Sequence, residues 1–429
     1  MSKTFNILLG ISLSLLHPFF LSAQLVEEPI DFPTDPTTKA KVLQENVKSQ
    51  VLGNNTFALE LFYRLKARQG NVLVAPYAVS STMAMAYAGA VGGSQGEMQS
   101  TFHYLSQNES LYEVFEFLNR KFTKSWYEGP NESRLFLANS LWIQRDLKIL
   151  PKFLDMISKY FKSSLKQADF MRNPESARVN INSWVKERTQ GRLPEMVKSE
   201  EIAKTTRLLL ISPVFMKAVW RHAFDPILSV NGVFFIDKVH SVAAHMMTTT
   251  ANFPFLQTDT FQVVEFPYRS SSKDEPQFSM IILLPRNTHD ATIVESVLTV
   301  ENFDTIVQSL KPRQVIATIP KFKLSSIFRL DQTLQNMGLS LPFSPFSDFS
   351  ELTSDHNLSI SGIFHKSVFS IDEKGTEAIA ATALSLNQKP ESRTEPAVVF
   401  KADHPFIFLI VDRSTNSIIF LGRIQSPEQ

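Results

Sequence analysis

The chain has 429 residues, 43% hydrophobic and 20% charged, which is typical of a globular protein with a large core. A formal net charge of +1 excludes a global attraction to nucleic acid or to a membrane surface. Because cysteine is absent, disulfide bonds, thiol catalysis and cysteine metal sites are excluded as well.

Residues 1–23 have the pattern of a secretory signal peptide. Lys3 gives a positive start, Ile7–Leu21 is mostly apolar, and the small pair Ser22–Ala23 offers a cleavage site. A membrane anchor is the alternative, but Pro18 and the short apolar stretch argue against a span. We therefore expect export, either to the extracellular space or, in a bacterium, to the periplasm or beyond.

Residues 24–42 are expected to form a flexible lead-in, because Val26–Thr38 is acidic and rich in proline. No internal repeat or composition shift follows, so residues 43–429 are expected to form a single domain.

Apolar periodicity and turn residues predict alternating helices and strands along that domain. The expected helices are Leu43–Gln69, Val79–Ala90, Phe153–Phe161, Ala177–Thr189, Val300–Leu310 and Leu330–Gly338. The expected buried strands are residues 71–76, Leu135–Ile143, Leu208–Phe215, Phe278–Pro285 and Val315–Lys323. In the helix at 177–189, we expect Val179, Ile181 and Trp184 to face inward.

A long connection lies between two further apolar runs that are typical of strands, Ser367–Ile371 and Ala397–Phe400. It has about two dozen residues, and structureless connections of that length are usually functional or disordered. Residues 376–389 contain neither Gly nor Pro, so this segment is able to become a strand inside a sheet. Alternate residues would then form one face that is small at its start and apolar at its end. An exposed loop of this kind has the potential for a large conformational change, from a loop to a buried strand.

Residues 92–96 fit the G-x-S-x-G pattern of a hydrolase nucleophile, with Ser94 at its centre. That motif requires a strand before the serine and a helix after it. Residues 84–91 are instead typical of a helix, so we interpret the motif as a turn between helices and assign no catalytic residue. The nine histidines are scattered singly, so neither a metal nor a cofactor is expected.

The stretch D-E-K-G-T-E-A-I-A-A-T-A, which begins at Asp372, resembles the hinge of a serpin reactive-centre loop. Phe400–Ile424 resembles the carboxyl-terminal signature of the same family, and the likeness extends over Leu43–Ile424. The resemblance implies a mixed α+β serpin fold with about three β-sheets and about nine helices. It also implies an exposed reactive loop at about residues 373–398.

The resemblance further implies an irreversible suicide-substrate inhibitor of a serine endopeptidase, most simply a trypsin-like one. The protease would attack the loop and become trapped as an acyl-enzyme while the hinge inserts as a new central strand. The protein would then be no enzyme, would need no cofactor, and would act as a monomer whose partner is the protease. A non-inhibitory carrier or chaperone, and an inhibitor of a cysteine protease, are the alternatives.

Several loop residues match the family's hinge. Their positions are Glu373, Gly375, Thr376, Glu377, Ala378, Ala380, Ala381 and Thr382, while Ile379 departs from the usual small residue. For the scissile bond, the family's usual spacing selects Lys389–Pro390, but trypsin-like enzymes cleave poorly before proline. We therefore favour Arg393–Thr394 slightly, and a cut nearer Leu386 stays open.

Three further residues, His365, Trp220 and Ser212, occupy positions beneath the main sheet that the family calls the shutter and the breach. His365 takes the shutter histidine position and Trp220 the breach tryptophan position. Ser212 stands where the family has Asn, and Ala75 and Ala78 stand where it has Ser. Because a buried imidazole needs hydrogen-bond partners, we expect a thinner polar network around His365.

Overall fold

The computed structural model describes residues 36–105, 108–127, 133–162, 164–271, 277–286, 291–355, 358–376 and 396–427. The chain separates into two compact units, residues 1–41 and 42–429, and both sheets and the candidate site lie in the second. The expected signal peptide at 1–23 lies outside the described residues. In the described part, no helix is long and apolar enough to cross a membrane.

Nine α-helices lie in the described part of the chain. They are α1 Pro36–Leu65, α2 Pro76–Tyr87, α3 Gly92–Phe102, α4 Asn108–Thr123, α5 Pro151–Met156, α6 Pro174–Arg188, α7 Thr292–Val297, α8 Val300–Ser309 and α9 Asp331–Gln335. The expectation of a flexible lead-in through residue 42 is wrong at its end, because α1 begins at Pro36. Proline suits a first helical turn, where its missing N–H would have no partner anyway.

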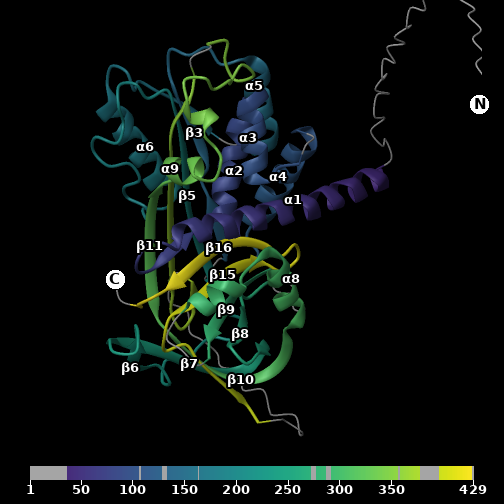
Figure 1. Cartoon of the computed structure of the whole chain (residues 1–429), viewed down its shortest axis with the longest axis vertical. Helices are drawn as coiled ribbons and strands as arrows, with labels where there is room; N and C mark the ends of the chain where they lie inside the picture. The colour runs from purple at the N-terminus through teal and green to yellow at the C-terminus, as the bar shows by residue number, and fades with distance from the viewer. Residues whose placement is uncertain are drawn as a thin grey trace, which may run out of the picture. The chain divides into compact units, whose positions relative to one another are not determined.

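One sheet has seven strands in the order β11-β12-β13-β5-β3-β4, with β2 paired to β5. Figure 1 labels β3, β5 and β11 of this sheet. Its strands are β2 Arg134–Leu137, β3 Ser140–Gln144, β4 Ser164–Ala168, β5 Leu208–Val219, β11 Phe322–Arg329, β12 Ile360–Ile371 and β13 Gly375–Thr376. The long strands β5 and β12 are almost wholly buried because helices and strands of the other sheet pack on their faces. Side chains of α6 pack on one face of β5, and α2 packs on the other.

The other sheet has nine strands in the order β1-β16-β15-β9-β8-β7-β10-β14, with β6 paired to β7. They are β1 Val72–Val74, β6 Val230–Phe235, β7 Ser241–Gln257, β8 Phe261–Pro267, β9 Phe278–Pro285, β10 Lys311–Pro320, β14 Val398–Lys401, β15 Phe406–Asp412 and β16 Ser417–Ile424. The expectation of about three sheets is not confirmed. The 17-residue β7 pairs with β6 and β10 along most of its length and with β8 at its end, so it joins two groups of strands.

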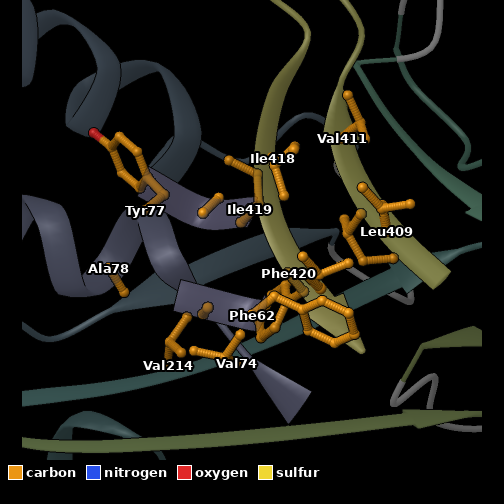
Figure 2. Packing of buried hydrophobic residues seen from close by; sticks show 14 of the residues in the cluster. Phe62, Val74, Tyr77, Ala78, Val214, Leu409, Val411, Ile418, Ile419 and Phe420 are labelled. Carbon is orange, nitrogen blue, oxygen red and sulfur yellow. The ribbon is translucent and has the colours of Figure 1, made fainter. Parts of the chain in front are cut away.

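The main hydrophobic core lies where the two sheets and the first helices meet. Figure 2 shows side chains of this core cluster from four elements, among them Phe62 of α1, Val74 of β1, Val214 of β5 and Phe420 of β16. All four side chains are at most 3% exposed. The core therefore holds β5, at the centre of the seven-stranded sheet, against the carboxyl-terminal strands.

Two of the expected strands are each divided in the structure. Leu135–Ile143 contains β2 and β3, and the break at Ala138 and Asn139 lies against Pro213 of β5. Pro213 has no amide hydrogen, so the ladder cannot continue through this point. Val315–Lys323 contains the end of β10 and the start of β11, which belong to different sheets.

The inward face of α6 also differs from the expectation at one position. Ile181 is fully buried and Trp184 is half-buried, but Val179 is 47% exposed. The buried apolar positions are Ala177, Ile181 and Val185, which follow the spacing of four residues that aligns one face of a helix. Val179 is two residues from Ile181 and therefore lies on another face.

Candidate functional site

The start of the reactive loop is already a strand between the two longest strands of the seven-stranded sheet. In β13, Thr376 pairs antiparallel with Ile371 of β12 and with Ala218 of β5. Farther along the sheet, β12 and β5 pair directly with each other in parallel, as far as Val368 and Phe215. The hinge therefore enters the sheet at the point where two parallel strands separate.

The tight turn Asp372–Gly375 connects β12 to β13 and positions β13 between β12 and β5. The Asp372 carboxylate accepts hydrogen bonds from the amides of Lys374 and Gly375, at 2.8 and 3.1 Å. The Asp372 amide donates in turn to the Gly375 carbonyl at 2.9 Å. A Cβ atom on Gly375 would lie 1.9 Å from the Ala218 carbonyl oxygen, so only glycine fits here.

Thr376 is buried beneath the turn beside two aromatic rings. Its hydroxyl lies 2.7 Å from the Tyr268 hydroxyl. The Tyr268 ring stacks on Trp220 with 4.4 Å between centroids, and the Trp220 indole N–H donates to the Asp372 carbonyl at 3.0 Å. Burial raises the pKa of Tyr268, although the hydrogen bond to Thr376 lowers it in part. The tyrosine stays neutral, so it has a proton to share with Thr376.

Glu373 ties the turn to the neighbouring sheet. Its carboxylate lies 3.2 Å from the Lys321 ammonium and 3.3 Å from His245 Nε2. Burial alone would raise the pKa of Glu373, but a backbone hydrogen bond, Lys321 and His245 together lower it. The Phe224 amide also donates to the Glu373 carbonyl at 2.8 Å, so both the backbone and the side chain of this residue are held.

His365 lies in the middle of β12 and is fully buried. Its Nε2 accepts a hydrogen bond from the Ala75 amide at 3.1 Å, and its Nδ1 lies 3.0 Å from the Ser212 carbonyl. Since a carbonyl only accepts, Nδ1 carries the proton and the ring is neutral. Burial lowers the pKa of His365 to about 4, although the bond to Ser212 opposes this. The Ser212 hydroxyl in turn donates to Asn139 at 3.3 Å.

Sequence reasoning missed one partner of His365, the Ala75 amide, and one partner of Ser212, the Asn139 side chain. We expected Ala75 to leave His365 with fewer hydrogen-bond partners. Instead, the Ala75 backbone amide, at the start of α2, donates a hydrogen bond to the His365 ring. A backbone donor leaves no trace in residue type. Asn139 offered a better signal, because a polar residue inside an apolar strand pattern often marks a break or a hydrogen bond.

The remaining hinge and scissile-bond residues lie outside the described residues. They are Glu377, Ala378, Ala380, Ala381, Thr382, Lys389, Pro390, Arg393 and Thr394. The chain is described again from residue 396 and enters β14 at Val398, which pairs in parallel with Val315 of β10.

Ser94 lies inside α3, after α2 and a short turn, so no strand precedes it. Its side chain is fully buried, and its hydroxyl accepts a hydrogen bond from the Asp348 amide. The arrangement contradicts a nucleophile elbow. Within the described ranges, no group of three or more His, Asp or Glu residues is placed to hold a metal ion.

A family model described as serpin (serine protease inhibitor) matches residues 52–427. The chain belongs to the serpin family. An uncharacterised serpin-like protein of Thermococcus kodakarensis is 32% identical over 92% of this chain and 90% of its own length. The leukocyte elastase inhibitor of Bos taurus is 33% identical over 87% of this chain and 98% of its own.

Solved serpin structures show the same fold. Human thyroxine-binding globulin, in complex with thyroxine, superposes with a TM-score of 0.79 at 26% identity, over 90% of this chain and 100% of that one. The mixed sheets and helices described above are therefore the serpin fold. A role in protease inhibition fits this family.

Proposed function

We propose that this serpin is an irreversible suicide-substrate inhibitor of a trypsin-like serine endopeptidase, and that it performs no catalysis of its own. The observation that carries the proposal is the position of β13, paired antiparallel with both β12 and β5 at the point where these strands part. A hinge in this position becomes a full central strand if β12 and β5 separate and the hinge extends between them.

The inserted state gains hydrogen bonds and buried surface. β12 and β5 share one parallel ladder, and a strand that enters between them replaces it with two antiparallel ladders, which are slightly more stable per residue. The free energy released by insertion drives the conformational change, as in other loop-insertion switches.

The register of β13 predicts where the rest of the loop would go. Gly375 pairs with Val219 and Thr376 with Ala218, so each later residue meets the next earlier residue of β5. Continued to Thr382, this register reaches Ser212 on β5 and, through the pairing of Ile371 with Thr376, His365 on β12. The proposed strand would therefore place the Thr382 hydroxyl at the shutter.

The same register assigns the two faces of the loop. Ala378 and Ala380 would meet Met216 and Val214, which are fully buried in the main core, so small side chains are favoured there. Ile379 would lie on the opposite face, together with Glu377, whose neighbour would be Lys217. The departure from the family at Ile379 is therefore compatible with insertion.

The chemistry that traps the protease uses the protease's own serine. Its Oγ attacks the carbonyl carbon of Arg393, and the bond between Arg393 and Thr394 breaks. The Thr394 nitrogen takes a proton and leaves as a new amino terminus, while the Arg393 acyl group stays as an ester on the serine. Insertion then moves the protease before water hydrolyses that ester.

Incubation of the purified protein with trypsin, followed by a denaturing gel and mass spectrometry, tests the proposal. We expect a complex that survives denaturation and a released fragment that begins at Thr394. Arg393→Ala should abolish the complex, whereas the matched variant Lys389→Ala should keep it. A fragment that begins at Pro390 would move the scissile bond and leave the mechanism intact. Cleavage without any stable complex would contradict inhibition and favour the carrier or chaperone alternative.

We further propose that the protein is exported and acts as a monomer. Export rests on the signal-like pattern of residues 1–23. Amino-terminal sequencing of the protein from its natural source tests this, and a mature chain that begins near Gln24 is expected. Retention of residues 1–23 would contradict it.

A further inference from the structure

The strand β6 and the turns on either side of it carry a dense group of exposed apolar side chains. They are Ile227, Leu228, Val230, Val233, Phe235 and Val239, each at least 38% exposed. A single exposed apolar side chain is ordinary on a protein surface, but a group of neighbours usually marks an interaction site. Because β6 itself contains no charged residue, the strand presents an uncharged surface to its surroundings.

The backbone of β6 has a free edge as well. In the described part of the chain, its only strand partner is β7. In an antiparallel ladder, alternate residues direct their N–H and C=O groups toward the same neighbour. The Phe235 amide donates to the Asp403 carbonyl at 2.8 Å rather than to β7. Asn231 and Val233 alternate with Phe235, so their backbone groups point away from β7, toward the free edge.

This edge lacks the features that usually prevent strands of different chains from pairing. Natural proteins protect an exposed edge with charged side chains, proline or a bulge. The strand β11, at the edge of the seven-stranded sheet, carries the exposed charges of Lys323 and Arg329. By contrast, β6 has no charge and no proline, and its register with β7 has no irregularity. An edge of this kind is suited to the addition of a strand from another molecule.

We propose that β6 pairs antiparallel with β6 of a second copy of this chain. A two-fold axis at Gly232 places Asn231 of each copy opposite Val233 of the other, and each of these pairs exchanges two backbone hydrogen bonds. Gly232 then lies opposite itself in a pair without hydrogen bonds, where antiparallel strands approach most closely. Glycine has no side chain to clash at that point.

A second copy fits this edge because the two ends of the strand complement each other. Antiparallel pairing brings the segment before β6 of one copy beside the turn after β6 of the other. Ile227, which is 85% exposed, then packs near Val239, which is 84% exposed. At the same ends, the negative charge of Asp225 lies near the positive charge of Lys238. The two-fold axis makes each of these contacts twice.

The dimer is weak and leaves the reactive loop out of the interface. Two paired six-residue strands with their flanking turns bury no more than the low end of a stable interface, about 1,200 Å². The copies therefore separate on dilution, and the protein meets its protease as a monomer. The loop begins at β13 in the other sheet and ends at β14, which pairs with β10. The pairing through β6 does not rest on the proposed function.

Sedimentation equilibrium of the purified protein between about 1 and 300 μM tests the pairing. We expect the average mass to rise with concentration toward twice that of one chain. Val233→Lys places a charge on the free edge and should weaken the association at least about tenfold. Val179→Lys on α6, where the native valine is 47% exposed against 49% for Val233, should leave it unchanged. The mass of a single chain at every concentration would overturn the proposal, as would association that persists in Val233→Lys.

Hydrogen exchange at the two ends of this concentration range locates the contact. The amides of Asn231 and Val233 should exchange more slowly in the concentrated sample, because each gains a partner in the other copy. Exchange in β11, the protected edge strand, should be the same in both samples. Slower exchange in β11 or β14 without a change in β6 would place the contact elsewhere and contradict the pairing.

Discussion

At Gly375 the fold leaves no space for a side chain, because the Ala218 carbonyl occupies the place of a Cβ atom. Gly375→Ala should therefore move β13 away from β5 and break the turn that holds the hinge. The amides of Trp220 and Phe224 donate to carbonyls of this turn, so their hydrogen exchange should become faster. Exchange followed by mass spectrometry measures this directly.

Gly96 provides the matched control, because a Cβ atom there would meet nothing within 4 Å. Gly96→Ala lies inside α3 and should stabilise the protein by up to about 1 kcal/mol, as alanine is the better helix former. Unchanged exchange at Trp220 in Gly375→Ala would show that the hinge is not held as described.

The pKa of His365, lowered to about 4 by burial, sets a pH dependence. Between about pH 6.5, the ordinary histidine pKa, and pH 4, the unfolded chain binds a proton that the folded protein does not. The free energy of unfolding should therefore fall as the pH decreases through this range, by up to about 3 kcal/mol from His365 alone.

Urea denaturation of the unmodified protein and of His365→Gln across this pH range isolates the effect. The variant should start less stable but lose less stability on acidification. If both proteins lose the same amount, another group controls the acid response.

At the scale of the strand, β13 is held by one buried side chain. Thr376→Arg would place a charge where the residue is fully buried beside Tyr268, and a buried unpaired charge is strongly unfavourable. The hinge should fail to insert, so trypsin should cleave the loop and leave unbound. Denaturing gels should show loss of the stable complex with retained cleavage, whereas Thr376→Ser, which keeps the hydroxyl, should still form it. A complex of normal yield in Thr376→Arg would contradict insertion through β13.

Sequence patterns predicted elements best where burial is continuous. The strand at Phe278–Pro285 has the bounds that were expected, because eight buried residues end at a proline. Patterns failed where pairing with distant strands sets the bounds of an element. No periodicity shows that Lys321 divides two strands of different sheets, or that Ser241–Gln257, which includes Asn252 and Pro254, is one long strand.

In the candidate site, some residues could be predicted from their type, whereas others depend on the tertiary structure. His365, Trp220 and Gly375 were selected on residue type and motif, because imidazole, indole and glycine have few equivalents. The Ala75 amide and the Tyr268 hydroxyl complete the site only through folding, since residues far apart in sequence supply them. Backbone donors of this kind have no sequence signature.

At the scale of the molecule, cleavage of the loop should raise thermal stability. Full insertion adds antiparallel ladders along both β5 and β12, and each kcal/mol gained raises the Tm by roughly 1 °C in a chain of 429 residues. A gain of about 5 kcal/mol would raise the Tm by roughly 5 °C. Differential scanning calorimetry before and after limited proteolysis measures the change. A Tm that stays the same or falls would mean that the cut loop remains outside the sheet.

The short strand β14 governs a different property, the time for which an uncut molecule stays competent. Within the described part of the chain, β14 pairs only with β10, through Val398 to Lys401. In the proposed mechanism an intact loop is anchored at this far end, so it can enter the sheet completely only after β14 leaves the edge. The lifetime of the uncut form would then depend on four cross-strand pairs at the edge of the sheet and on the packing of a single core side chain, Phe400, which is fully buried against Phe266.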